Sequence, residues 1–303
     1  MIWMASEQTK GDETMSTYYV GWDVGAWECP NTKFAARSQD CITILDEGGK
    51  LLFAWMGNIY CPPKNNNGDA KLKDETKTLF KLINSLIGDE NNIIHKSNDF
   101  SKIDENDKLF IAIDAILGLP NLATSLFNLD ENEKNTDKVE DIIKNHKKYL
   151  FRLTERNLPK HKSPLSVLKD MLGSQATKAL FTLRYWNFKW NAQELVWEMD
   201  NHISLETYPS AAYANVINMN DKMEIEWNNV FNANDEPPKI QLNPAKDIKS
   251  RWLDLNDSII CAKVAKEYKE NNCLSPSLGE EDEAAKQEGW IWLPNSSWGK
   301  KAD

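Results

Sequence analysis

A short apolar run in the middle of the chain predicts a buried strand around which the fold is built. Every residue from Leu109 to Ile113 is apolar, the stretch before this run is polar, and Gly118 and Pro120 follow it. A continuous apolar run between turn residues is typical of a strand that is buried on both faces of a sheet. Asp114 comes directly after the run. A carboxylate at the mouth of a buried strand is costly unless it is paired, hydrogen-bonded or bound to a cation.

The other hydrophobic patterns predict strands early in the chain and helices between strands later. Two apolar segments on either side of the turn at residues 47–50, EGGK, indicate a β-hairpin. Apolar residues spaced three and four apart indicate a helix that ends at Gly88. We expect strands over residues 18–23, 41–46, 51–56, 109–114 and 202–208, helices over residues 71–87, 164–180, 211–216 and 246–271, and a strand or ordered coil over residues 288–294.

The order strand, strand, strand, helix, strand predicts an α/β fold. Residues 1–17 lack the basic and apolar regions of a secretory signal, so we expect a flexible N-terminal extension there. The strand pattern breaks off between residues 121 and 200, where a charged stretch and an aromatic-rich stretch occur, and then resumes. We therefore expect a single domain over residues 18–303 with a helical and aromatic insertion at about 121–200.

Charge, hydropathy and cysteine content argue against two classes, proteins that coat nucleic acid and proteins that span a membrane. A net charge of −10 argues against a protein that coats nucleic acid through bulk electrostatics. It leaves room for an enzyme that meets nucleic acid through a local basic patch and a bound divalent metal. No stretch approaches the roughly 18 consecutive apolar residues of a membrane span. The five cysteines form no C-x-x-C pair, so we expect a cytoplasmic protein with reduced thiols and no membrane partner.

Four acidic residues are candidates for one shared site. Asp23, Asp114 and Glu206 lie at or near the ends of three predicted strands, and open α/β sheets bind ligands at the carboxyl ends of their strands. Asp257 lies on the apolar face of the predicted helix over 246–271. Like charges gathered in a dry cleft need a cation, and hard carboxylate oxygens select Mg²⁺ or Mn²⁺. The pattern therefore indicates a carboxylate-held metal site.

Each acid also has a plainer interpretation. Asp23 suits the turn made by Gly25, and Asp114 suits the first position of a turn. Asp257 lies in the first part of a helix, where the helix dipole favours any anion. Glu206 suits an ion pair with an arginine. Both sets of interpretations stay open at this point.

Six segments of the chain form an ordered set of motifs. They are VGWDVG (20–25), IAIDAILGLP (111–120), RLTER (152–156), LETYPSAAY (205–213), NDSIICAKVA (256–265) and EGWIWLP (288–294). In this order the chain resembles the predicted RNase H-like nucleases grouped as domain of unknown function 429. The resemblance implies an RNase H-like mixed sheet, in which three antiparallel strands are followed by helices that alternate with two further strands. It also implies a metal-dependent nuclease activity, a hydrolase of nucleic acid.

The resemblance places Asp23, Asp114 and Asp257 on the family's acidic positions, and Glu206 on its Glu before Tyr-Pro. The implied mechanism uses two divalent ions about 3.5–4 Å apart, bridged by Asp23, with the other three acids completing the coordination shells. One ion lowers the pKa of the attacking water, and the other stabilises the leaving oxygen. The charged stretch 130–148 and the aromatic stretch 181–197 are longer than a minimal member needs, which leaves substrate and partners open.

A basic segment at residues 152–162, RLTERNLPKHK, is the candidate for holding the substrate backbone. A guanidinium fork suits phosphate oxygens. Its basic residues are Arg152, Arg156, Lys160, His161 and Lys162. The alternative is that Glu155 pairs with an arginine and that the lysines belong to a solvated loop.

The aromatic residues of the stretch 181–197 admit two interpretations, stacking on unpaired bases or packing in the core or a protein interface. They are Tyr185, Trp186, Phe188, Trp190 and Trp197. Two other functions also stay open. One is a catalytically silent subunit of this fold that acts through a protein partner or as a homo-oligomer. The other is nucleotide binding of the actin and sugar-kinase kind, although Asp23-Val24-Gly25 is followed by Ala26 and Trp27, where that fold has a hydroxyl.

Overall fold

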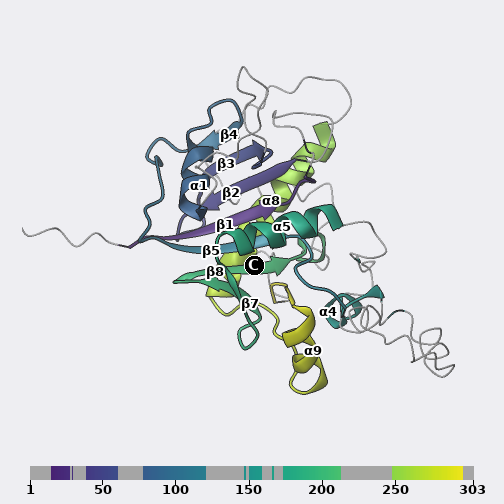
Figure 1. The fold of residues 1–303 in the computed structure, drawn as a ribbon. Helices are drawn as coiled ribbons and strands as arrows, with labels where there is room; N and C mark the ends of the chain where they lie inside the picture. The colour runs from purple at the N-terminus through teal and green to yellow at the C-terminus, as the bar shows by residue number, and fades with distance from the viewer. Residues whose placement is uncertain are drawn as a thin grey trace, which may run out of the picture.

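The computed structural model describes residues 15–27, 29, 39–60, 78–120, 147, 150–158, 166, 173–212 and 248–295, which form one mixed sheet with helices on both faces (Figure 1). The strands are β1 (Thr17–Asp23), β2 (Asp40–Leu45), β3 (Leu51–Gly57), β4 (Ile93–Lys96), β5 (Lys108–Asp114), β6 (Lys189–Asn191), β7 (Val196–Met199), β8 (His202–Thr207) and β9 (Ile291–Trp292). The helices are α1 (Leu79–Ile87), α4 (Leu153–Arg156), α5 (Gly173–Tyr185), α6 (Pro209–Ala212), α8 (Ile248–Lys269) and α9 (Glu280–Glu288). None of the helices in these ranges has the length and apolar character needed to cross a membrane.

The sheet has the strand order β4-β3-β2-β1-β5-β8-β7-β6, with β9 also paired to β8. β1 pairs parallel with β5, β5 pairs parallel with β8, and β8 pairs parallel with β9. All other neighbouring strands in the described residues are antiparallel. The carboxyl ends of β1, β3, β5 and β8 therefore lie at the same edge of the sheet.

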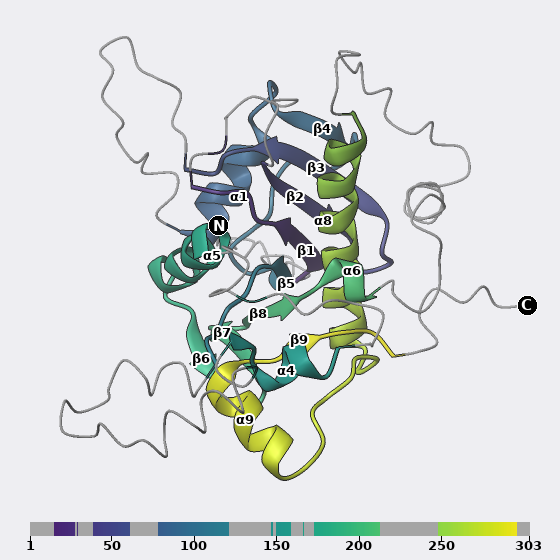
Figure 2. The same cartoon turned by 90° about the vertical axis from the view of Figure 1, so that its right-hand side faces the viewer.

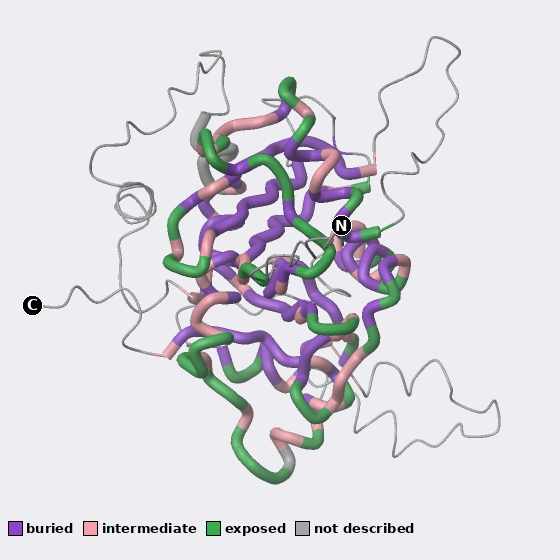
Figure 3. The backbone as a smooth tube through the Cα atoms, turned by 90° about the vertical axis from the view of Figure 1, so that its left-hand side faces the viewer, coloured by how far each residue is buried: buried purple, intermediate pink, exposed green. Residues whose placement is uncertain are grey.

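Side chains alternate between the two faces of the sheet, as the pleat requires. On one face, Tyr19 and Cys41 pack in a hydrophobic cluster with Ile260 and other residues of α8. On the other face, Trp22 and its neighbours pack with residues of α1 and α5. Figure 2 shows α8 along one side of the strands and α1 and α5 on the opposite side. In Figure 3 the strands are buried while many connecting loops are exposed.

Gly21 allows α8 to lie directly against β1. A Cβ atom at this position would lie 1.8 Å from the carbonyl oxygen of Ser258 and 2.5 Å from the backbone nitrogen of Ala262. The hydroxyl of Thr43 also donates a hydrogen bond of 2.9 Å to the Ser258 carbonyl. Asp23 follows Gly21 by two residues and so lies on the same face of β1. The close approach therefore brings the early turns of α8 next to the end of β1.

The elements that the hydrophobic pattern predicts are largely present. β1, β2, β3, β5, β8 and α8 lie within one or two residues of their expected bounds, and β9 is a short final strand. The expected helix over 71–87 is α1 from Leu79 onward, and its earlier part lies outside the described residues. The expected helix over 164–180 is α5, which begins at Gly173. The charged stretch 130–148 and the N-terminal extension lie almost wholly outside these residues.

Three short strands have no counterpart among the predicted elements. β4 extends the sheet beyond β3, and β6 and β7 extend it beyond β8. β6 and β7 belong to the region that we expected to be an insertion, and they continue the same sheet. Their short sequences carry too little periodicity to be recognised without the neighbouring strand that pairs with them.

Candidate functional site

Asp23 and Asp114 are neighbours at the carboxyl ends of β1 and β5. They are the last residues of the two strands, and they are register partners in the parallel pair. Adjacent strands lie about 4.8 Å apart, and in-register residues of parallel strands point to the same face. Both carboxylates therefore lie on the face that α8 covers. The predicted convergence of these two acids is confirmed.

α8 adds two further carboxylates to this pair. Asp254 and Asp257 are separated by one helical turn and so share a face of α8. Both are partly exposed. Both act electrostatically on Asp23. Asp257 was expected in the site, but Asp254 was not singled out from the sequence, although its position three residues before Asp257 was a usable signal.

The environment of Asp23 disfavours a bare negative charge. Burial raises the pKa of the Asp23 carboxyl well above its usual value, because only 9% of the residue is exposed. The negative charges of Asp254 and Asp114 raise this pKa further. Asp257 and Asp40 act in the same direction more weakly. A proton on Asp23, or a cation beside it, would relieve this repulsion.

From the raised pKa of Asp23 we predict how the free energy of unfolding depends on pH in a metal-free buffer. An unfolded Asp23 titrates near 3.8 and the folded one at higher pH, so the folded protein binds more protons between these values. The free energy of unfolding should therefore fall as pH rises from about 4 toward the raised pKa. Asp23→Asn removes this group, so we expect a more stable protein at neutral pH and a flatter pH dependence.

Urea unfolding across a pH series in EDTA measures this effect. Asp200→Asn is the matched control, because Asp200 is exposed, lies in a turn with φ of 53°, and suits asparagine. The control should keep the slope of the parent protein. Equal slopes for both variants and the parent would show that Asp23 is not the group that titrates.

Glu206 points to the other face of the sheet. In the parallel pair of β5 and β8 it is the register partner of Ile113, which belongs to the hydrophobic cluster under α1 and α5. Successive strand residues alternate in direction, so Glu206 and Asp114 lie on opposite faces. Both carboxylate oxygens of Glu206 bind Arg152, and Oε2 also accepts a hydrogen bond of 2.9 Å from the backbone nitrogen of Leu117. The structure thus shows the ion pair that was the plainer interpretation of Glu206.

Arg152 is not available to a phosphate. Its side chain is fully buried and bridges two acids. Nε donates to Glu155 at 2.7 Å, and Nη1 donates to Glu206 at 2.9 Å and to the carbonyl oxygen of Glu288 at 3.1 Å. The structure therefore gives Arg152 a structural role in place of the expected contact with substrate. The spacing of charged residues in the sequence did not reveal this, because one of its two acidic partners is 54 residues away.

Of the remaining basic candidates, Arg156 is exposed on α4. Lys160, His161 and Lys162 lie outside the described residues. The expectation that this segment holds the substrate backbone therefore remains a prediction for these four residues.

A buried lysine anchors the loop that follows Asp23. Lys178 of α5 is completely buried and pairs with Asp40 at 2.5 Å. Its ammonium also donates hydrogen bonds to the carbonyl oxygens of Gly25 at 3.3 Å and Ala26 at 3.2 Å. α5 is thus tied to the chain directly after β1, which helps to position the end of that strand.

A pocket of about 160 Å³ opens at the carboxyl ends of β1, β5 and β8. We call it the carboxylate pocket. Asp23, Asp114 and Glu206 contribute to its walls, together with Gln175 from α5 and Tyr208 after β8. Substrates of open α/β sheets bind at this edge. Within the described ranges, no group of three or more His, Cys, Asp or Glu side chains is arranged so that it could hold a metal ion.

The aromatic stretch serves mainly as core. Trp186, Phe188 and Trp197 are buried, and the ring centroids of Trp22 and Trp186 lie 6.5 Å apart. Trp190 is partly buried and packs beside Trp197, with ring centroids 5.9 Å apart. Of the two interpretations of this stretch, core packing applies to most of its residues.

The chain was compared with known proteins at three levels. No model of a protein family, no curated protein and no solved structure matches it. The arrangement of the carboxylates and their pocket is therefore the basis on which a function is proposed.

Proposed function

We propose that the protein is a metal-dependent nuclease with an RNase H-like core that hydrolyses phosphodiester bonds in nucleic acid. The observation that carries the proposal is the buried carboxylate of Asp23. It lies beside Asp114 in register and next to two acids of α8, at the edge of the sheet where a pocket opens. Such a gathering of like charges is tolerable when a cation neutralises it.

The fold is consistent with this proposal. The sheet is mixed and open: β3, β2 and β1 are antiparallel neighbours, and β1, β5 and β8 are parallel neighbours, which supports the proposal at the level of an α/β fold. α8 follows β8 and packs across β1, β2 and β5, so it delivers acids to the ends of the central strands. β4, β6, β7 and β9 are additions to this core. Fold alone does not determine activity, so the carboxylates remain the main support.

The donor chemistry of the cluster suits Mg²⁺ or Mn²⁺. Asp23 and Asp114 offer hard oxygen ligands, which these ions prefer, and Asp254 and Asp257 add negative charge beside them. Asp23 and Asp114 are the residues that would hold the cation, with the two acids of α8 beside them. A bound divalent ion supplies charge neutralisation and activates water for attack on phosphorus. Glu206 is not part of this set, because Arg152 binds both of its carboxylate oxygens.

Cation binding predicts a measurable stabilisation. Mg²⁺ or Mn²⁺ that binds only the folded protein should raise the melting temperature in a concentration-dependent way. Asp23→Asn and Asp114→Asn should abolish most of this rise, whereas the exposed control Asp200→Asn should retain it. An equal rise in all four proteins would contradict cation binding at the cluster.

The activity itself is tested by incubating the protein with single- and double-stranded DNA and RNA in Mg²⁺ or Mn²⁺. We expect cleavage that EDTA stops. Asp23→Asn and Asp114→Asn should each lower the rate at least about tenfold, which corresponds to about 1.4 kcal/mol of lost transition-state stabilisation. Asp200→Asn should cleave like the parent protein.

Two results would overturn the proposal. Cleavage that persists unchanged in both variants would assign the activity to another site or a contaminant. Thermal stabilisation by ATP without any cleavage would favour nucleotide binding of the actin and sugar-kinase kind.

A further inference from the structure

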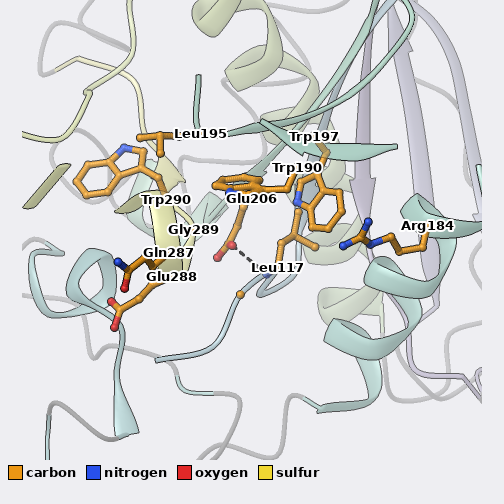
Figure 4. Close-up of a pocket in the computed structure, with 11 residues that line it drawn as sticks. Leu117, Arg184, Trp190, Leu195, Trp197, Glu206, Gln287, Glu288, Gly289 and Trp290 are labelled. Atoms are coloured by element: carbon orange, nitrogen blue, oxygen red, sulfur yellow. Dashed lines mark hydrogen bonds between the residues drawn. The ribbon is translucent and has the colours of Figure 1, made fainter. Parts of the chain in front are cut away.

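A second pocket lies beside the carboxylate pocket, on the face of the sheet that carries Glu206. We call it the tryptophan pocket, and its volume is about 200 Å³. Its main walls are the side chains of Leu117, Arg184, Trp190, Trp197, Glu206 and Trp290. Figure 4 shows these side chains gathered around one hollow, although they come from a loop, a helix end and four strands or strand ends. The hollow is small, largely apolar and walled by flat rings.

The indole N–H of Trp197 has no acceptor in the described part of the chain. Trp197 is only 6% exposed, so this donor is buried. The other two indoles of the pocket are satisfied, because Trp190 donates to the carbonyl oxygen of Lys286 at 3.0 Å and Trp290 donates to that of Leu274 at 3.0 Å. Buried donors in folded proteins nearly always have a partner. Of the three indole N–H groups of the pocket, that of Trp197 is the one left unsatisfied among the described residues.

The charged groups of the pocket add two further features. The guanidinium of Arg184 lies 4.9 Å from the ring of Trp197 and is exposed. Among the described residues, Arg184 makes no ion pair. Glu206 has one unused lone pair on Oε1, because that atom accepts only from Arg152, whereas Oε2 accepts from Arg152 and Leu117. The pocket therefore offers a cation at its rim and an acceptor at its inner wall.

We propose that the tryptophan pocket binds an unpaired nucleobase of the nucleic-acid substrate. A flat base fits among indole rings, which stack on any base. Its ring nitrogen or carbonyl oxygen accepts from Trp197, its amino group donates to Glu206, and the phosphate next to it lies within the reach of Arg184. The substrate class is single-stranded nucleic acid or a strand from which one base is turned out.

The two pockets share one wall. Glu206 lines both of them, and Trp290 in the tryptophan pocket is followed directly by Ile291 in the carboxylate pocket. Gln175 of the carboxylate pocket and Arg184 of the tryptophan pocket lie on the same helix, nine residues or about 14 Å apart. In this proposal a short single strand runs from one pocket to the other. This part of the inference rests on the proposed nuclease function.

Binding measured without metal tests the pocket separately from catalysis. The probes are the four nucleosides and their 5′-monophosphates, titrated calorimetrically in EDTA against the full chain. We expect at least one nucleoside to bind. Trp197→Phe keeps an aromatic ring and removes the N–H, and it should weaken that binding about fivefold or more. Its unfolding midpoint should fall, because the smaller ring leaves a void at a buried position, so binding is compared at a temperature at which both proteins are folded.

Arg184→Gln separates the phosphate contact from the base contact. It should weaken binding of the monophosphate by severalfold and binding of the nucleoside by clearly less, because the phosphate contact is lost only in the first case. Lys189→Gln is the matched control, because Lys189 is also exposed and close in sequence, on β6. The control should bind both probes like the parent protein.

Failure of the pocket and failure of the nuclease function give different results. Absence of nucleoside binding at about 1 mM, or equal affinity in Trp197→Phe and the parent protein, would overturn the base pocket even if nucleic acid is cleaved. Nucleoside binding that Trp197→Phe weakens would support the base pocket even if no metal supports cleavage. In that second case the nuclease function alone would fall.

Discussion

Replacing Arg152 by methionine is expected to lower the free energy of unfolding by about 3–5 kcal/mol. The guanidinium is fully buried and balances Glu155 and Glu206, which are themselves 3% and 5% exposed. Methionine fills part of the space but leaves two carboxylates in a dry environment with no cation. An uncompensated buried charge is far more costly than the loss of a surface ion pair.

The loss in Arg152→Met should be smaller at pH 5 than at pH 7. Burial already raises the pKa of Glu155 in the parent protein, and Arg152 opposes that rise. Without Arg152 the pKa of the Glu155 carboxyl should rise further. When a carboxyl has a raised pKa in the folded state, the free energy of unfolding of the protein falls as pH increases. A lower pH should therefore reduce the destabilisation caused by Arg152→Met. Chemical denaturation at both pH values measures the difference.

Arg156→Met is the control for this prediction. Arg156 lies on the same short helix and is exposed, so its replacement should change stability by no more than about 0.5 kcal/mol. A second variant, Arg152→Met combined with Glu206→Gln, should regain part of the loss, because one of the stranded charges is removed. If Arg152→Met is no less stable than Arg156→Met, the buried network does not hold this edge of the sheet together.

Gly21→Ala is expected to lower the free energy of unfolding by about 3 kcal/mol, at the upper end of the cost of overpacking a core. The new methyl would lie 1.8 Å from the Ser258 carbonyl oxygen and 2.5 Å from the Ala262 nitrogen. Both are backbone atoms of α8, so no side chain can rotate away. The helix as a whole must move off the sheet.

Gly173→Ala is the matched control, because a Cβ at Gly173 meets nothing within 4 Å and Gly173 begins α5. Alanine is the better helix former, so the control should be neutral or more stable by up to about 1 kcal/mol. Thermal unfolding of both variants measures the effect. Displacement of α8 should also weaken the stabilisation by Mg²⁺, because Asp254 and Asp257 move with the helix. A Gly21→Ala protein as stable as the parent would show that α8 does not pack this closely on β1.

The two mutations test opposite sides of the same sheet. Gly21 sets how α8 lies on one face, and with it the acids that surround Asp23. Arg152 holds Glu206 on the other face, and with it the wall between the two pockets. The site therefore depends on packing at positions that carry no chemistry of their own.

Much of the fold could be predicted from local patterns. The apolar run of β5, the hairpin of β2 and β3, and the long helix α8 follow from periodicity within the chain. Asp23 and Asp114 were recognisable because each ends a predicted strand. Their convergence needed only the rule that ligands of such sheets bind at the carboxyl ends of strands.

The sequence by itself determined which segments become strands and helices, and that two strands end in aspartate, because these properties depend on neighbours in the chain. Only the tertiary structure decided which acids meet. A single step along β8 puts Glu206 on the face opposite Asp114, where Arg152 binds it, and a close approach at Gly21 brings Asp254 to Asp23. Side chains alternate between the two faces with every residue, so the face that Glu206 occupies depends on the register of β8 against β5. Contacts between distant segments depend on how the faces pack, and neither property is encoded in any one stretch of sequence.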